Sequence, residues 1–344
     1  MKVAALTSGK NVPSARFRVR QYLDYLKLEQ IVVEELYSSI DKYSPPTPIM
    51  QQLAFGDWKR ATRYMLWLKQ QKKKTLVKKA NTYDVIWLER NLVETRLTYE
   101  LQLKHPLVLD LDDAIWLNEA RGFEDKLASH ADVVFAGNAF LADRMSKYNS
   151  NVTVIPTAVD TSAFIPAVKK EQQKVNIGWI GTSSNFQYLK ALSAVLERIS
   201  RENKDIEVHI CSDKKPDFFR FPFHFEQWSS AVEIPFIQKL DIGLMPLEDN
   251  EWTRGKCSFK MLQYMSCGVP ALVSPYGMNA EVLALWDQEM GAVDEHDWYA
   301  KLHELAANPD RRTIRGQSAR AVVLQHYAVD VVGKKIAEQF KKLI

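Results

Sequence analysis

Three cationic side chains within seven residues give the strongest chemical signal in this sequence. They are Arg254, Lys256 and Lys260, which follow an aliphatic run and lie at the start of a segment with helical spacing. Trp252 and Phe259 stand among them, which indicates a partly desolvated setting. Guanidinium and ammonium groups in such a setting bind phosphate oxygens. The sequence therefore predicts a diphosphate site here, and an exposed run of charges is the simpler alternative.

A second candidate anion site is the Gly-Thr-Ser-Ser-Asn segment at 181–185. It follows the apolar run 175–180 and precedes a segment with helical spacing of apolar residues. Backbone N–H groups and hydroxyls at the amino end of a helix bind phosphate. Ordinary helix capping is the alternative interpretation. The sequence has neither the six-residue dinucleotide glycine pattern nor the phosphate loop that ends in Lys-Ser/Thr.

Acidic residues end two predicted strands in the first half of the chain. Glu89 ends one, and the Leu-Asp-Leu-Asp-Asp-Ala stretch at 109–114 ends the next. Strand alternation would put Asp110 and Asp112 on one side of that strand and Asp113 on the other. These carboxylates are candidates for binding hydroxyl groups, and helix capping by Asp113 is the alternative.

The elements that would position these groups indicate an α/β chain. Its 344 residues suit two domains. Short aliphatic runs alternate with helical stretches, which predicts two parallel sheets. The predicted strands are 3–6, 31–36, 84–88, 107–111, 132–136 and 152–155, then 175–180, 206–211, 221–225, 241–245, 269–273 and 291–293. We predict domains at 1–160 and 161–328, a linker at 156–173 and a final helix at 329–344.

Composition narrows the class of protein. With 46% apolar and 26% charged residues the chain is globular rather than disordered or fibrous. No run approaches the roughly 18 apolar residues that span a bilayer, and no secretory signal is seen. The three cysteines have no metal-ligand spacing, and the histidines stand alone in the sequence, so none is assigned a ligand or base role. We expect a cytoplasmic protein.

Residues 58–80 form a basic segment with nine lysines and arginines and no acidic residue. Aromatic and aliphatic residues are interleaved with these charges, as in a basic amphipathic helix. One interpretation is a solvated helix packed by one face. The other is docking on an anionic surface, including the inner face of a membrane, to which the protein would be peripheral. Binding of nucleic acid is not expected, because no second basic stripe and no nucleic-acid motif accompany the segment.

Several segments together resemble the retaining glycosyltransferases of family 4. The first is Val154-Ile-Pro-Thr-Ala-Val-Asp160, and the others lie at 241–246, 252–270 and 274–282. The resemblance covers most of residues 130–330, whereas residues 1–130 match only in layout. It implies the GT-B fold, which has two Rossmann-like parallel-sheet domains facing across a cleft. In such enzymes the amino-terminal domain takes the acceptor and the carboxyl-terminal domain takes the nucleotide sugar.

The resemblance also implies roles for residues of the second half. Thr182 and Ser183, next to Gly181, would touch the diphosphate. Arg254, Lys256 and Lys260 would balance its charge, with Gln263 on the ribose and Asn279 and Glu281 near the sugar or diphosphate. Two departures from the family pattern stand out. Gly255 and Gln263 replace a pair of glutamates, and residues 182–185 replace an Arg and a Lys.

In the first half, the layout places Glu89 and Asp112 where related enzymes often have histidines. We therefore predict a catalytic set made of Arg254, Lys260, Asp112 and Glu89. The predicted acceptor-binding residues are Arg16, Arg18, Asp112 and Asp113. A basic surface turn is the alternative for the two arginines. The stretch 109–114 also resembles the metal-binding Asp-x-Asp of GT-A glycosyltransferases and the nucleophile motif of haloacid-dehalogenase-type phosphatases. Both would need Mg²⁺ or Mn²⁺ on the paired aspartates.

The expected function is transfer of a sugar from a nucleotide-diphosphate sugar to a saccharide or lipid-linked acceptor. The resemblance implies retention of the anomeric configuration and a role in surface polysaccharide biosynthesis. No cofactor and no metal are expected, and the nucleotide sugar is a substrate. Two alternatives remain, a catalytically weak binding or scaffold protein with the GT-B fold and a nucleotide-sugar epimerase of the same fold.

Overall fold

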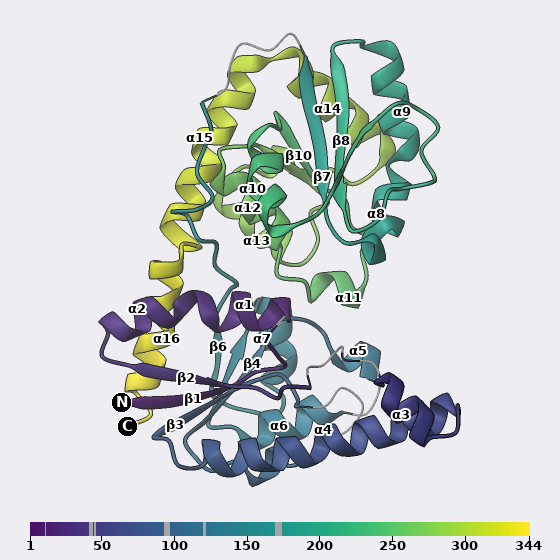
Figure 1. Ribbon diagram of the computed structural model, residues 1–344. Helices are drawn as coiled ribbons and strands as arrows, with labels where there is room; N and C mark the ends of the chain where they lie inside the picture. Colours follow the sequence, from purple (N-terminus) through teal and green to yellow (C-terminus); the bar gives the residue numbers. More distant parts are fainter. Residues whose placement is uncertain (11, 41–43, 45, 93–96, 120–121, 169–173) are drawn as a thin grey trace. The chain divides into compact units, whose positions relative to one another are not determined.

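The computed structural model describes residues 1–344 except 11, 41–43, 45, 93–96, 120–121 and 169–173 (Figure 1). The chain divides into two compact units, Met1–Thr157 with Val332–Ile344 and Ala158–Val331. The division after Thr157 lies near the predicted boundary at residue 160. Part of the predicted linker, 169–173, lies outside the described residues. Most of the final helix, α16 (Val329–Lys341), is counted with the first unit.

The first unit is built on a six-stranded sheet whose described pairings are all parallel. In order across the sheet the strands are β2 (Val32–Leu36), β1 (Lys2–Leu6), β3 (Val85–Glu89), β4 (Leu107–Leu111), β5 (Val133–Ala136) and β6 (Val152–Val154). Every residue of β3 and β4 is buried. Both faces of these strands are covered, which explains why their residues are apolar except for Glu89 and Asp110.

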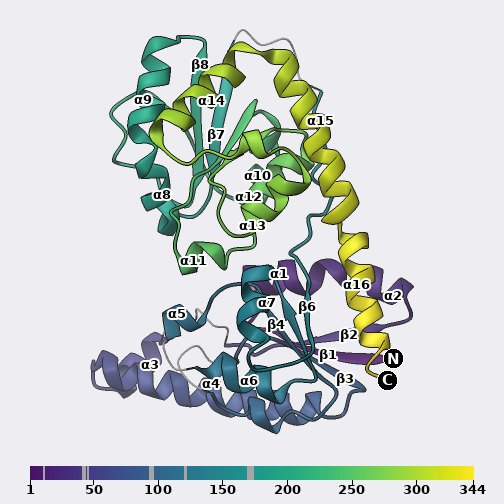
Figure 2. The same ribbon diagram turned by 180° about the vertical axis from the view of Figure 1, so that it is seen from behind.

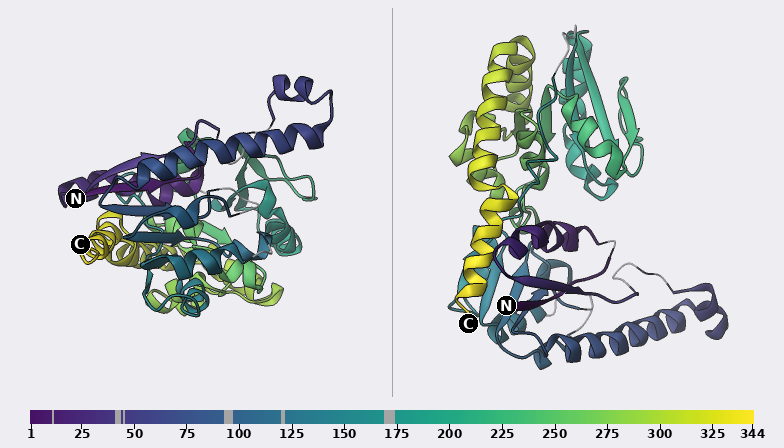
Figure 3. Two further views of the ribbon diagram at one scale, coloured as in Figure 1. Left: turned by 90° about the horizontal axis from the view of Figure 1, so that it is seen from below. Right: turned by 60° about the vertical axis from the view of Figure 1, so that its left-hand side comes forward.

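Helices cover the two faces of this sheet. They are α1 (Pro13–Arg18), α2 (Leu23–Leu28), α3 (Pro48–Leu53), α4 (Trp58–Ala80), α5 (Trp116–Glu119), α6 (Phe123–His130), α7 (Ala139–Met145) and α16. The long helix α4 runs along one face, and α1 and α16 lie on the other (Figure 3). Phe340 of α16 packs on Trp87 and Phe135, with ring centroids 5.3 and 6.0 Å apart.

The second unit has a five-stranded parallel sheet. Its order is β11 (Ala271–Val273), β10 (Ile242–Met245), β7 (Val175–Ile180), β8 (Ile206–Ser212) and β9 (His224–Gln227). The predicted run 291–293 forms only an isolated bridge, Val273 to Gly291. β7 is central, so its carboxyl end lies beside that of β10. The predicted α/β class with two parallel sheets is confirmed.

Eight α-helices are described in this unit, on both faces of its sheet. They are α8 (Phe186–Ala191), α9 (Ser193–Glu202), α10 (Ser230–Gln238), α11 (Glu251–Arg254), α12 (Phe259–Ser266), α13 (Met278–Leu285), α14 (Glu295–Ala307) and α15 (Pro309–His326). α8, α9 and α14 lie on one face, and α10, α12 and α13 lie on the other (Figure 2). None of the helices within the described parts of the chain has the length and apolar character to cross a bilayer.

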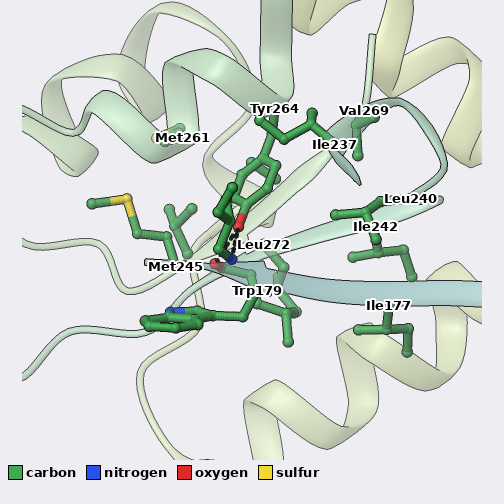
Figure 4. Packing of buried hydrophobic residues seen from close by; sticks show 14 of the residues in the cluster. Ile177, Trp179, Ile237, Leu240, Ile242, Met245, Met261, Tyr264, Val269 and Leu272 are labelled. Atoms are coloured by element: carbon green, nitrogen blue, oxygen red, sulfur yellow. Dashed lines mark hydrogen bonds between the residues drawn. The ribbon is translucent and has the colours of Figure 1, made fainter. Parts of the chain in front are cut away.

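Tyr264 fixes α12 against the sheet of the second unit (Figure 4). Its buried hydroxyl accepts the N–H of Ile180 at 2.9 Å and donates to the carbonyl of Leu244 at 3.3 Å. Gly243 faces the Tyr264 ring, which a Cβ at that position would overlap. One side chain therefore joins the ends of β7 and β10 to the helix that carries Lys260 and Gln263.

Candidate functional site

The first predicted cation, Arg254, lies at the end of α11. Asn250 caps this helix in a capping box with Thr253, which fixes the loop after β10. Gly277 has a φ of +55°, and a Cβ there would lie 2.6 Å from the Cα of Arg254, so the backbone of the next loop packs directly on this residue. The guanidinium of Arg254 binds both oxygens of Asp249, at 2.7 and 2.9 Å. Arg254 thus shares its charge with a carboxylate.

Lys256 joins the two predicted anion-binding segments. Its Nζ lies 3.4 Å from the Oδ1 of Asn185 and 5.2 Å from the ring centroid of Trp252. Asn185 belongs to the turn that follows β7, and its amide donates to the hydroxyl of Thr182 at 2.9 Å. A lysine from the loop after β10 is therefore held at the turn after β7. Both segments were predicted to bind one diphosphate, and the structure brings them together.

Lys260 belongs to a buried polar cluster that the sequence analysis missed in part. Its Nζ donates to the Oε1 of Gln263 at 3.0 Å and lies 3.4 Å from the Oε1 of Glu233. The amide of Gln263 donates to the same Glu233 oxygen at 3.1 Å. Gln263 is fully buried, so both ends of its amide are engaged inside the unit. In this conformation the amide of Gln263 is therefore not available for the predicted contact with the ribose. The carboxylate of Glu233 lies beside that amide.

The turn after β7 already holds an anionic side chain. Ser183 donates its backbone N–H and its hydroxyl to the carboxylate of Asp213, which follows β8. Although partial burial opposes it, these hydrogen bonds hold the pKa of Asp213 below its ordinary value. Ser183 thus binds an anionic group, as predicted for its sequence context, but in this structure that group is the carboxylate of Asp213. Gly181 lies against the ring of Trp179, and a Cβ at 181 would lie 2.5 Å from it.

The remaining residues predicted to contact the nucleotide sugar, Asn279 and Glu281, lie on α13. Asn279 is fully buried and donates to the carbonyl of Ser274 at 2.9 Å. Its Oδ1 has no hydrogen-bond partner among the parts of the chain that the structure describes. Glu281 is half-buried on the same helix. These two residues stay predictions for the sugar side of the donor.

In the first unit, Arg90 contacts the acidic residues that were predicted to take part in catalysis or acceptor binding. Its guanidinium binds Asp112 at 2.5 to 2.7 Å and Asp113 at 2.6 Å, and it lies 3.7 Å from Glu89. Arg90 adopts a φ of +59°, in the left-handed region that few residues occupy without strain. Asp112 and Asp113 were predicted to face opposite sides. They converge because β4 ends at Leu111, so strand alternation no longer applies.

The same cluster bears on the metal alternatives for the 109–114 stretch. Asp112 and Asp113 share one guanidinium, which engages one oxygen of each carboxylate and places a positive charge beside both. Glu89 accepts the N–H of Ser8 at 3.0 Å. Burial is the largest influence on Glu89 and raises its pKa above the ordinary value. A carboxyl group with a raised pKa suits proton transfer.

The two predicted acceptor arginines differ in setting. Arg18 is 1% exposed and donates to Asp110 at 2.7 and 2.9 Å and to the carbonyl of Ile155 at 2.7 Å. These hydrogen bonds engage the guanidinium inside the unit, which differs from the predicted role of Arg18 in binding the acceptor substrate. They tie α1 to β4 and to the residue that follows β6. Arg16 is exposed and lies 4.8 Å over the ring of Phe17. Only Arg16 of the pair faces solvent.

Three residues of these clusters escaped the sequence analysis: Arg90, Asp213 and Glu233. Each lies directly after a strand or in the first turn of a helix. A search of every strand end for charged residues would have found Arg90 and Asp213. Glu233 gives no such signal, because its place beside Gln263 depends on how α10 packs against α12.

No protein-family model and no curated protein sequence matches this chain. Solved structures do resemble it. The Anabaena protein HepE, in complex with UDP and glucose, has a TM-score of 0.67 at 14% identity, with 100% of both chains covered. The trehalose-6-phosphate synthase OtsA has a TM-score of 0.70 at 11% identity, again with 100% of both chains covered. A glycosyltransferase from Rickettsia africae has a TM-score of 0.67 at 10% identity, covering 99% of this chain and 98% of its own.

These likenesses extend over the whole chain and both sheets. They define the class of fold, which is the GT-B fold of glycosyltransferases with two Rossmann-like units. The identities are too low to carry more than the fold. Membership of family 4 stays a prediction.

Proposed function

We propose that this protein is a glycosyltransferase that moves a sugar from a nucleotide-diphosphate sugar to a saccharide or lipid-linked acceptor. One observation carries the proposal. The Nζ of Lys256 lies 3.4 Å from the Oδ1 of Asn185 in the turn after β7, which brings a cation from one predicted anion-binding segment to the other. HepE, which shares the fold, is known in complex with UDP and glucose.

The chemistry of transfer explains why cations are needed there. The bond between the sugar and the diphosphate breaks as negative charge builds on the departing diphosphate. Preorganised cations and N–H donors lower the energy of that transition state, each by about 3 kcal/mol in favourable cases. Lys256, Lys260 and Arg254 would supply this charge once Arg254 releases Asp249 and Lys260 releases Glu233. Ser183 would add its N–H and hydroxyl once it releases Asp213.

Retention of the anomeric configuration is part of the proposal. It rests on the resemblance to family 4, in which attack comes from the side of the leaving group and a phosphate oxygen helps to accept the acceptor proton. Glu89, with its raised pKa, is the proposed second proton acceptor. Asp112 and Asp113 would bind acceptor hydroxyls, and Arg16 would contact an anionic acceptor. No metal is proposed for the reaction.

A panel of nucleotide sugars tests the proposal, with release of the nucleoside diphosphate measured in the presence of EDTA. We expect release with at least one donor and, with an acceptor, a product whose anomeric configuration NMR shows to be retained. Tight binding without release would favour the scaffold alternative. Conversion of the sugar without an acceptor would favour the epimerase. A reaction that EDTA abolishes would contradict the metal-independent mechanism.

We further propose that helix α4 docks on an anionic membrane surface, where a lipid-linked acceptor for surface polysaccharide would be found. Phe55, Trp58 and Trp67 are 91, 57 and 51% exposed, and they lie in the same stretch as Lys59 and Arg63. Exposed aromatic side chains beside cations suit a lipid interface. We expect co-sedimentation with phosphatidylglycerol vesicles but not with phosphatidylcholine vesicles. Equal sedimentation of the Phe55→Ser/Trp67→Ser variant would contradict this docking.

A further inference from the structure

Two histidines that are distant in the sequence meet on the sheet of the second unit. His209 of β8 pairs in register with His224 of β9, so the two side chains share one face of the sheet. Their rings are stacked with centroids 4.7 Å apart. Glu207, two residues before His209, lies on the same face. The expectation that the histidines stand alone is therefore wrong for this pair, because strand pairing joins what the sequence separates.

The nitrogen and oxygen atoms of these side chains converge. The Oε2 of Glu207 lies 3.6 Å from the Nε2 of His209 and 3.4 Å from the Nε2 of His224. One ligand atom from each of the three side chains fits within 4.8 Å of the others. Zinc bonds of about 2.1 Å place the ligand atoms of a tetrahedral site roughly 3.4 Å apart. The two contacts of Glu207 match this spacing, and the His224 ring, which is 58% exposed, can swing to close the third.

A fourth ligand comes from the neighbouring strand. The amide nitrogen of Asn176, on β7, donates to the carbonyl of Lys239 at 2.9 Å, and this contact turns its Oδ1 toward His209. That Oδ1 lies 3.2 Å from the Nε2 of His209. The set therefore holds two imidazole nitrogens, a carboxylate oxygen and an amide oxygen. Imidazole and oxygen donors in this combination suit Zn²⁺ and related divalent metals.

The two lysines next to this cluster are each paired with a carboxylate. Lys174 is paired with the other oxygen of Glu207, at 2.5 Å, and Lys239 is paired with Glu226. His209 is 7% exposed, and its Nδ1 has no hydrogen-bond partner within the part of the chain that is described. A metal would bind His209 through its Nε2, the ring nitrogen that lies near Glu207 and Asn176.

We propose that Asn176, Glu207, His209 and His224 form a binding site for Zn²⁺ or a similar divalent transition metal. The ligands come from three adjacent strands, so the metal would tie the short edge strand β9 to β8 and β7. They lie in the first residues of β7 and β9 and the first half of β8, whereas the candidate donor site lies at the carboxyl ends of the strands. The site is therefore structural and separate from the transfer reaction.

Titration of metal-stripped full-length protein with Zn²⁺, followed by calorimetry, tests this proposal. We expect one Zn²⁺ per chain, a higher melting temperature and slower amide hydrogen exchange at residues 224–227. The side chain of His224 is mostly exposed. The His224→Ala variant should bind Zn²⁺ at least tenfold more weakly and should show no rise in melting temperature with Zn²⁺. His296→Ala changes an exposed histidine of the same unit and should leave both unchanged.

Three results would overturn the site. The first is the absence of Zn²⁺ binding to wild-type protein at micromolar concentrations. The second is equal binding by wild-type protein and His224→Ala. The third is binding that is lost in Cys257→Ser but kept in His224→Ala, which would place the metal on a thiol. None of these results depends on glycosyl transfer, so the proposed function and the metal site can fail independently.

Discussion

Ser183 donates its backbone N–H to one carboxylate oxygen of Asp213 at 2.5 Å and its hydroxyl to the other at 2.8 Å. A carboxylate thus lies where the sequence places a phosphate, on the turn after the central strand of the second sheet. The same donors can serve either anion but not both at once. In the proposed donor site, Asp213 would therefore compete with the diphosphate for Ser183.

This competition predicts that Asp213→Ala binds UDP more tightly than wild-type protein. Removing the carboxylate leaves the Ser183 donors for the phosphate, and we expect a Kd about tenfold lower, or about 1.4 kcal/mol. Calorimetric titration with UDP measures the effect. Asp217→Ala, an exposed aspartate of the same segment, should leave the Kd unchanged. Weaker binding by Asp213→Ala would mean that Asp213 orients Ser183 for the donor instead.

A second prediction concerns the charge of Lys260. Lys260→Met keeps the length of the side chain but removes the ammonium group that we propose to oppose the charge of the diphosphate. We expect kcat/KM for donor cleavage to fall about 100-fold, which corresponds to about 2.7 kcal/mol of transition-state stabilisation. Lys190→Met, on the exposed side of α8, is the matched control. Unchanged kcat/KM in Lys260→Met would remove this residue from the mechanism.

The close approach of two loops predicts a large cost for Gly277→Ala. The residue has a φ of +55°, and an added Cβ would lie 2.6 Å from backbone atoms of Arg254. Strain and overlap together should lower the free energy of unfolding by more than 2 kcal/mol. Gly56 has a φ of +77° with nothing within 4 Å of an added Cβ, so Gly56→Ala should cost only about 1 kcal/mol. Chemical denaturation of both variants measures the difference, and equal costs would contradict the overlap.

The buried carboxyl of Glu89 predicts a particular pH dependence of stability. Burial raises its pKa in the folded protein above 4.5, so the folded state holds this proton more tightly than the unfolded state. Wild-type protein should therefore lose stability relative to Glu89→Gln as pH rises from about 4.5 through the folded pKa. Denaturation at pH 4 and pH 8 checks this, with near equality at pH 4 and a more stable variant at pH 8. A variant that is less stable by the same amount at both values would contradict the raised pKa.

Much of the fold could be predicted because aliphatic runs such as 107–111 and 175–180 are buried on both faces of a parallel sheet. The run 291–293 has the composition of another strand, yet it pairs with β11 only through Gly291. In the site, Lys256 was found because cations cluster along the sequence. Glu233 and the pairing of His209 with His224 were missed, because packing of α10 on α12 and the register of β9 bring them together, and neither is local in the sequence.

We propose that the second unit binds a diphosphate between the turn 181–185 and the lysines at 256 and 260. The most direct test is calorimetric titration of UDP, GDP and ADP into wild-type protein and into Lys256→Met/Lys260→Met. We predict that at least one diphosphate binds once per chain and that the double variant binds it at least 100-fold more weakly. Equal affinity in the double variant, or no binding of any of the three by wild-type protein, would contradict the account.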